Sequence, residues 1–289
     1  MDASQVLQFL LAGLTLGSIY ALVGFSVALV HRASTIMNLA QGEFSMLGAM
    51  TAIYLTTVTK LPLALAFVIA VLVGAFGGLL LERVVIRPAL HFPTIMVVMV
   101  TVGAAIAIEG FAVVVWGRDS FTLMPFTGQD PIPVFGATIL PQAIWVLGVG
   151  VLLSVVFWMF FEKTTLGLAM RAAAENRSAA ALIGIEGERV TMIAFGMSAA
   201  VAAVAGIIIA PLIFTSFLTG LTITIKGSVA AVLGGIHSNV GVILGGLILG
   251  LSESLVAGFL PSLYKDVFAV LLLLILLCLK PNGIMGERR

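Results

Sequence analysis

The chain has 289 residues, of which 61% are hydrophobic, 14 are basic and 13 are acidic. Charged residues make up 9% of it, against about 25% in an ordinary soluble domain, and its mean hydropathy is +1.23. These values exclude a soluble enzyme and a disordered chain, and a net charge of +1 gives no electrostatic basis for a nucleic-acid partner. We therefore expect an integral membrane protein in contact with lipid.

Nine apolar segments are candidates for membrane-spanning helices, because about 20 apolar residues are needed to cross the hydrocarbon core. Eight qualify by length: 5–30, 36–58, 61–81, 94–116, 139–161, 190–213, 240–259 and 264–280. The ninth, 221–236, is shorter and glycine-rich, and is either a tilted span or half of a re-entrant hairpin. The first segment is too long for the apolar region of a cleaved signal peptide and should be retained. The predicted fold is an all-α, polytopic transmembrane bundle of eight or nine spans.

The most polar stretch inside any predicted span runs from Asn38 to Ser45. In a regular helix Asn38, Gln41, Gly42 and Ser45 share one face, whereas Glu43 lies well round the cylinder. Either Glu43 meets another helix, or the helix is unwound near Gly42. Because broken helices are common at transporter substrate sites, these five residues form a candidate substrate path. The competing interpretation is a polar network between helices.

Two more carboxylates, Glu109 and Glu253, fall at membrane depth. There an acidic side chain costs about 2.5–3.5 kcal/mol on insertion scales, so it usually faces the bundle or a water-filled path. Both lie on stripes of small residues, with Thr101, Ala105 and Ala112 beside Glu109, and with Gly246, Gly250 and Ala257 beside Glu253. Each is a candidate path residue or a partner in an inter-helix hydrogen bond. Neither has an intramembrane Lys or Arg partner in the predicted topology.

Small residues recur at helical spacing in several spans. The pairs are Gly13 and Gly17, Gly74 and Gly78, Gly241 and Gly245, and Gly246 and Gly250, with Ser198, Ala202 and Gly206 continuing the pattern. Small residues let helix backbones approach closely in lipid. They predict tight packing within the bundle.

Two connections are long. The stretch 117–138 is rich in Gly and Pro and is predicted to be an external loop. The stretch 162–189 is alanine-rich and carries four basic and four acidic residues, so it has good helix propensity without the apolarity to span. We expect one or two short cytoplasmic helices here, broken at Gly184 and Gly187, of the kind that docks a cytoplasmic partner.

The basic residues predict the orientation of the chain. If 82–93 is cytoplasmic, ten of the 14 basic residues face the cytoplasm, as the positive-inside rule requires. Only Lys60, Arg118, Lys226 and Lys265 then fall outside. This arrangement places the N-terminus outside and the C-terminus inside, which requires an odd number of crossings.

The chain lacks the motifs of a nucleotide-using or metal-dependent enzyme. It has no P-loop sequence, its three histidines are far apart, and no cysteine–histidine cluster indicates a metal site. The sequence therefore predicts no enzyme activity, no cofactor and no metal.

Several motifs together resemble a known family. The run Asn38-Leu-Ala-Gln-Gly-Glu-Phe-Ser-Met-Leu-Gly48 is similar to the Asn-Phe-Ala-His-Gly-Glu signature region of branched-chain amino-acid ABC transporter permeases, with Gln41 in place of the histidine. The opening Gly13–Leu22, the run Ala231–Gly235 and the ending Lys280–Gly286 also fit. The likeness covers nearly the whole chain and is closest to the shorter, LivH-type permease.

The resemblance implies an ABC importer permease fold in which 1–289 is a single transmembrane permease domain of a bacterial cytoplasmic (inner) membrane. It implies a path for branched-chain or related amino acids. The implied partners are a second permease, related or identical, two cytoplasmic ATPase subunits and a periplasmic or extracellular substrate-binding protein. The stretch 162–189 then corresponds to the ATPase-docking segment, with Gly167, Arg171, Ala174, Glu175 and Gly184 as coupling residues. Arg171 and Glu175 either pair along one helix or face the ATPase.

Two other classes of function compete with this hypothesis. An ion- or proton-coupled secondary transporter or channel would use Glu43, Glu109 and Glu253. A membrane scaffold or intramembrane enzyme is the third alternative.

Overall fold

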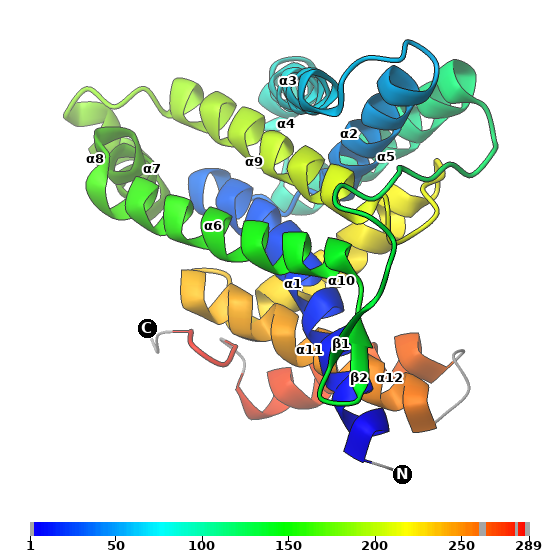
Figure 1. Cartoon of the computed structure of the whole chain (residues 1–289). Helices are drawn as coiled ribbons and strands as arrows, with labels where there is room; N and C mark the ends of the chain where they lie inside the picture. Colours follow the sequence, from blue (N-terminus) through cyan, green and yellow to red (C-terminus); the bar gives the residue numbers. More distant parts are fainter. Residues whose placement is uncertain (1–2, 260–263, 281–282, 287–289) are drawn as a thin grey trace. The chain divides into compact units, whose positions relative to one another are not determined.

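The computed structural model describes residues 3–259, 264–280 and 283–286. Within these residues the chain is helical apart from its connections, one of which contains a small hairpin (Figure 1). The elements are α1 (Ala3–Ser34), α2 (Gln41–Thr57), α3 (Leu63–Leu81), the π-helical turn η1 (Glu82–Ile86), α4 (Arg87–Ala89), α5 (Thr94–Trp116), β1 (Ile132–Val134), β2 (Ala137–Ile139), α6 (Pro141–Lys163), α7 (Thr165–Glu175), α8 (Arg177–Leu182), α9 (Gly187–Ile209), α10 (Thr219–Gly234), α11 (Asn239–Phe259) and α12 (Tyr264–Leu279).

Every predicted apolar segment contains a helix, which confirms the all-α membrane fold. Among the described residues, six helices are long and apolar enough to cross a membrane, and two shorter apolar helices accompany them. The short segment predicted at 221–236 is one continuous helix, α10, that passes through Gly227 and ends at Gly234. Its 16 residues extend about 24 Å, less than the ~30 Å of a hydrocarbon core.

The contacts between residues group the chain into two compact units. One comprises 26–123 and 155–225, and the other the described parts of 1–25, 124–154 and 226–289. Helices α1, α6 and α10 each contribute to both units.

In the unit built from 26–123 and 155–225, helices α2, α3 and α9 pack side by side (Figure 1). Small residues make this possible, because a Cβ atom at Gly78 would meet Ala199 and one at Gly206 would overlap the backbone oxygen of Ser45. The Ser198 hydroxyl also donates a hydrogen bond of 2.6 Å to the carbonyl oxygen of Ser26. The predicted small-residue stripe on α9 is therefore a packing surface.

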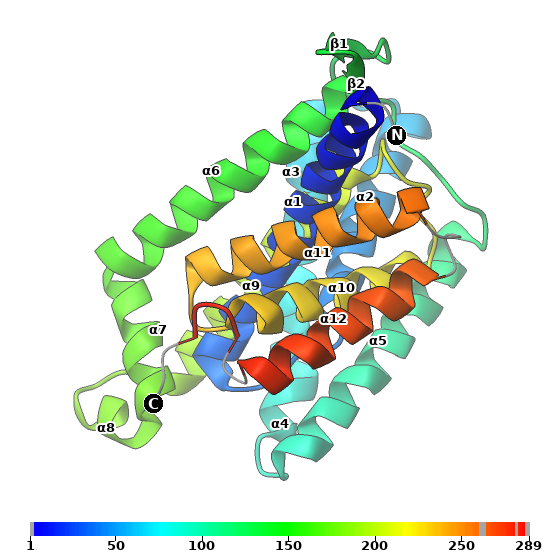
Figure 2. The same cartoon turned by 90° about the horizontal axis from the view of Figure 1, so that it is seen from below.

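In the other unit the N-terminal part of α1 lies against α11. Gly13 and Gly17 contact Leu251 and Leu247, and Gly250 in turn abuts Gly17. Helices α10, α11 and α12 are the yellow to red helices of Figure 2. Helix α11 contacts α12, and Gly241 of α11 packs directly on Gly234 of α10. The predicted glycine pairs are again confirmed as helix contacts.

The end of the Lys280–Gly286 run is hydrogen-bonded to the end of α10. The backbone N–H groups of Ile284 and Met285 donate to the carbonyl oxygens of Leu233 and Gly234, each at 3.0 Å. Pro281 and Asn282 of the same motif lie outside the described residues. The run Lys280–Gly286, which resembles the family ending, therefore contains the residues that bond to the end of α10.

The long connection 117–138 contains a hairpin that the sequence analysis did not predict. Strands β1 and β2 pair antiparallel with Val134 opposite Ala137. Phe135 and Gly136 between them have φ values of 47° and 85°, as a type I′ turn requires at both positions. The dipeptide Phe135-Gly136 forms the turn. Glycine is common at its second position, but phenylalanine is uncommon at its first, so the sequence did not indicate a hairpin here.

The stretch 162–189 folds into the short helices α7 and α8, as predicted, but the positions of the breaks differ. Gly184 is a break, with φ of +86°. Gly187 is not, because it is the first residue of α9. The break between α7 and α8 is at Asn176, whose side chain accepts a hydrogen bond from the backbone N–H of Ala179 at 2.9 Å and so caps α8. An asparagine favours such a cap over a helix interior.

Candidate functional site

The polar stretch from Asn38 to Ser45 forms a folded entry to α2. Residues 36–40 are not helical, so the break precedes Gly42 rather than falling on it. Asn38 is fully buried; its oxygen accepts from the Ala40 N–H at 3.1 Å and its amide donates to Oε1 of Gln41 at 3.2 Å. The hydroxyl of Thr101 on α5 accepts from the Leu39 N–H at 3.1 Å. The sequence thus builds an irregular, buried backbone segment that is held by side-chain hydrogen bonds.

Helix α10 closes the other side of this segment within the same unit. The buried hydroxyl of Thr224 accepts from the Gly42 N–H at 2.7 Å and donates to the Gly220 carbonyl oxygen at 2.9 Å. It therefore satisfies a donor in the first turn of α2, which has no side-chain cap of its own. Gly220 packs directly on the Glu43 carboxylate, and a Cβ atom there would overlap it. Glu43 meets another helix, which was one of the two predicted outcomes.

Three side chains in this cluster have buried polar atoms without hydrogen-bond partners among the described residues. They are Glu43 through both carboxylate oxygens, Gln41 through Nε2 and Ser45 through its hydroxyl. Buried polar groups normally have hydrogen-bond partners, because a buried group without one loses its hydrogen bonds to water and gains none in the protein. The first two turns of α2 therefore present a carboxylate, an amide donor and a hydroxyl with unused hydrogen-bonding capacity. We call Asn38, Gln41, Gly42, Glu43 and Ser45 the α2 polar cluster.

Of the other two predicted path residues, Glu109 lies near enough to the α2 polar cluster for its charge to act on the Glu43 carboxylate. Glu109 lies half-buried on α5, on the face that buries Thr101, Ala105 and Ala112. Glu253 belongs to the other compact unit. The sequence indicated Thr101 only as a small neighbour of Glu109, and it did not indicate Gly220 or Thr224, because threonine and glycine are too frequent in apolar helices to mark a site.

Glu253 has an intramembrane cationic partner, contrary to the sequence prediction. The Lys226 ammonium on α10 donates to Oε1 of Glu253 at 2.5 Å, and the Tyr20 hydroxyl on α1 donates to Oε2 at 2.9 Å. The Lys226 ammonium also lies 5.5 Å from the centre of the Tyr20 ring. The prediction was wrong because it placed Lys226 outside the membrane, whereas the residue lies in the middle of α10. The contacts support an inter-helix role for Glu253.

The docking segment, residues 162–189, carries the predicted coupling residues. Gly167 is packed on the Phe160 backbone at the corner between α6 and α7, and a Cβ atom would overlap the Phe160 carbonyl oxygen. Arg171 is exposed and donates to Oε1 of Glu162 at 3.1 Å, a partner that the sequence spacing did not indicate. Ala174 is half-buried and Glu175 is exposed, both near the end of α7. Gly184 is exposed and needs its positive φ.

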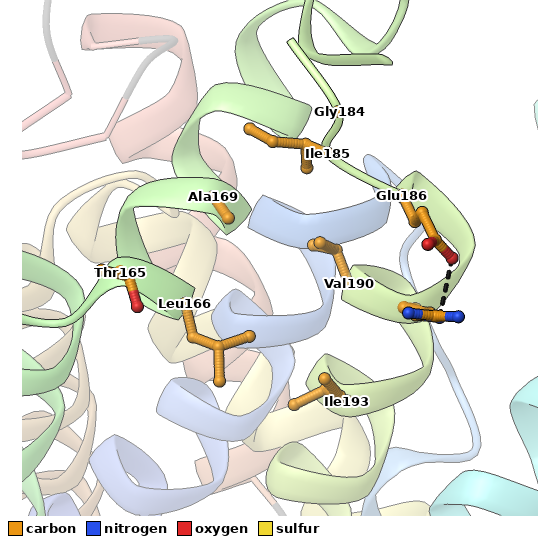
Figure 3. A pocket seen from close by; sticks show the side chains of 9 residues that line it. Thr165, Leu166, Ala169, Gly184, Ile185, Glu186, Val190 and Ile193 are labelled. Carbon is orange, nitrogen blue, oxygen red and sulfur yellow. Dashed lines mark ion pairs between the residues drawn. The ribbon is translucent and has the colours of Figure 1, made fainter.

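An open groove of about 350 Å³ lies between α7 and the start of α9 (Figure 3). Its walls are mostly apolar and its rim is charged: Thr165, Leu166, Ala169, Gly184, Ile185, Glu186, Arg189, Val190 and Ile193. Glu186 and Arg189 form an ion pair of 2.7 Å on this rim. Next to the groove, Leu182 and Ile183 at the end of α8 are 89% and 75% exposed. These apolar groups face outward from the molecule where the sequence predicts cytoplasm.

Among the described residues, no three His, Cys, Asp or Glu side chains gather as metal ligands. The polar groups described above are hydrogen-bonding and ion-pairing groups placed on helices. Their arrangement suits the passage or docking of molecules.

Comparison with known proteins identifies the family. Residues 9–277 match the model of the branched-chain amino acid transport system / permease component family. The chain belongs to this family of ABC importer permeases.

Relatives over the whole length agree with this assignment. The chain is 32% identical to the high-affinity branched-chain amino acid transport system permease protein LivH of Escherichia coli K12, with 97% of this chain and 96% of that protein covered. It is 33% identical to BraD of Pseudomonas aeruginosa, a permease protein of the same kind of system, over the same shares. The autoinducer 2 import system permease protein LsrC of an Enterobacter strain is 28% identical over 90% of this chain and 77% of that protein.

A solved structure supports the fold. PsaBC from Streptococcus pneumoniae, in complex with a Fab, aligns with a TM-score of 0.56 at 13% identity and covers 96% of this chain and 93% of that one. By its family and its full-length relatives, the protein is a multi-pass permease subunit of a bacterial ABC importer, and it is not itself the catalytic subunit. This decides against the secondary transporter, the scaffold and the intramembrane enzyme.

Proposed function

We propose that this permease forms part of the inward path for branched-chain or closely related amino acids. The relatives at 31–33% identity bear the names of branched-chain amino acid systems, whereas a more distant relative is named for autoinducer 2 import. The 38–48 run resembles the family signature but has Gln41 in place of histidine, so the substrate class rests on the relatives and not on this run. The partners are a second permease, related or identical, two cytoplasmic ATPases and a periplasmic or extracellular binding protein.

The observation that carries the path proposal is the unused hydrogen-bonding capacity of the α2 polar cluster. A free amino acid carries an ammonium and a carboxylate group. The Glu43 carboxylate offers an acceptor for the first, and Gln41 Nε2 and the Ser45 hydroxyl offer donors for the second. The irregular backbone at 36–40 resembles the broken helices from which many transporters build substrate sites. Glu109 and Glu253 are secondary candidates, and the Lys226 contact gives Glu253 a structural role that needs no substrate.

The experiment for the substrate class uses the assembled importer in liposomes, with the permease, its partner permease, the ATPases and the binding protein. We expect uptake of labelled leucine that excess isoleucine or valine suppresses and that excess urea, acetamide or ribose leaves unchanged. Competition by urea or ribose, with none by isoleucine or valine, would contradict the amino-acid assignment.

We further propose that the ATPases dock on residues 162–189. Leu182 and Ile183 are exposed, and an apolar groove lies beside them. Protein interfaces commonly bury such apolar groups at their centre when the partner binds. Deletion of 170–186 should abolish co-purification of the ATPases while the shortened chain still inserts into the membrane. Retention of the ATPases by the shortened chain would contradict the docking assignment.

A further inference from the structure

The cytoplasmic end of α3 contains an irregular turn that lies outside the α2 polar cluster and the groove. Helix α3 continues directly into η1, where the Arg87 backbone N–H bonds to the carbonyl oxygen of Glu82, five residues earlier. Such π turns are rare and often occur at functional positions. Because the turn spans five residues, it places the Arg87 side chain over that of Glu82, and their Nε and Oε1 atoms are 3.5 Å apart. In a regular α-helix residues five apart point in different directions.

Arg87 also reaches a second helix. Its Nη1 atom lies 3.0 Å from Oε2 of Glu188, the second residue of α9. The side chain of Glu82 is 0% exposed, that of Arg87 is 23% exposed and that of Glu188 is 65% exposed. A single guanidinium thus joins a buried carboxylate at the end of α3 to an exposed carboxylate in the docking segment.

Glu188 has a different ion-pair partner from the charged residues next to it in the sequence. Glu186 and Arg189 pair with each other on the rim of the groove, so Glu188 is the acid of this turn that reaches α3. Helices α3 and α9 pack closely along their lengths through Gly74 and Gly78. The Arg87 bridge secures the same two helices at the end where the docking segment begins.

We propose that Arg87 is a positioning residue that makes α3 and the start of α9 move as one body when the ATPases act on the docking segment. The proposal rests on the proposed docking function. A force on 162–189 reaches α9 first, because α9 starts at Gly187. The guanidinium fork holds two carboxylates at once, which a lysine could not do with the same geometry. Glu82, buried in the bundle, anchors the fork, so displacement of Glu188 is passed on to α3.

The informative variant is Glu188→Gln, because it releases α9 while the Arg87–Glu82 contact remains and the altered side chain is exposed. Asp130→Asn is the control, because it neutralises an exposed carboxylate outside the docking segment. In a Cys278→Ser background, spin labels at Leu80→Cys on α3 and Met192→Cys on α9 report the separation of the two helices. The measurement is made on the assembled importer in liposomes, without nucleotide and after trapping with ATP and vanadate.

With the wild-type Glu188 and with Asp130→Asn, the distance between the labels should be the same in both states. With Glu188→Gln, it should equal the wild-type value without nucleotide and shift or broaden by about 2 Å or more after trapping, the scale of helix shifts in switching proteins. A merely structural role would already alter the nucleotide-free distance. An unchanged distance in Glu188→Gln, with the ATPases bound, overturns the proposal and leaves the docking function standing. Retention of the ATPases after deletion of 170–186 overturns both.

Discussion

Lys226 and Glu253 form an ion pair between α10 and α11 inside an apolar bundle. Lys226 is 12% exposed and Glu253 3% exposed at their side chains, and the Tyr20 hydroxyl on α1 donates a hydrogen bond to Oε2 of the carboxylate. Ionisable residues at membrane depth are costly unless they are paired. The pair therefore fixes the mutual position of three helices in one unit of the permease.

Breaking this pair should destabilise the permease strongly. Lys226→Met leaves the Glu253 carboxylate buried without its cation, a change that costs about 3–5 kcal/mol in buried pairs. Tyr20→Phe removes one hydrogen bond and should cost about 1 kcal/mol. Thermal unfolding of the purified permease in detergent measures both. A Lys226→Met variant as stable as the wild type would show that the pair contributes nothing to the packing of α10 on α11.

The contact between α2 and α9 should be intolerant of one added methyl group. A Cβ atom at Gly206 would overlap the Ser45 carbonyl oxygen, whereas one at Gly110 on α5 has no atom within 4 Å. Gly206→Ala should lower stability by about 1–3 kcal/mol through overpacking. Gly110→Ala is the matched control and should be neutral or stabilising by up to about 1 kcal/mol, because alanine is the better helix former. Equal unfolding temperatures for the two variants would contradict the close approach.

Gln41→Leu should impair transport more than assembly. The change keeps the side-chain volume roughly the same and removes the unpaired Nε2 donor of the α2 polar cluster, together with the acceptor for Asn38. We expect uptake of labelled leucine to fall by about tenfold or more, the effect of losing a polar contact in a desolvated site, while yield and ATPase binding persist. Unchanged uptake would remove the cluster from the substrate path.

Leu182→Asp should weaken the binding of the ATPases. Leu182 is 89% exposed at the end of α8, so the substitution costs the isolated permease little, but it places a charge where an apolar anchor is expected to be buried. Phe135→Asp, in the turn of the hairpin at a residue that is 95% exposed, is the control. Titration of the purified ATPase onto permease in nanodiscs should show about tenfold weaker binding for Leu182→Asp only. Equal affinities for both variants would place the interface elsewhere.

Much of the helical framework could be predicted from the sequence, because apolar length and small-residue spacing act locally along each helix. The stripe of Gly246 and Gly250 indicated a helix contact, and both glycines pack against α1. The polar run at Asn38–Ser45 was recognisable because amides and carboxylates are rare in apolar segments. The start of α2 at Gln41 was less predictable, because its capping oxygen comes from Thr224, 182 residues away.

The ion pairs were the least predictable features. Whether Lys226 lies at the membrane surface or inside the bundle depends on where α10 begins, and glycines in the segment obscured its continuity. The Arg87 contact with Glu82 depends on a π turn, which has no sequence signature and changes which side chains are neighbours. Charge counting predicts an orientation for the chain, but it does not predict the partners of individual charges.

The central claim is that this chain is the path-forming subunit of an importer that ATPases drive through its docking segment. The direct measurement is uptake of labelled leucine into liposomes that contain the permease with or without its partner subunits. We predict uptake only with the second permease, the ATPases, the binding protein and ATP present together. Uptake by the permease alone under an imposed proton gradient, without any ATPase, would contradict the account.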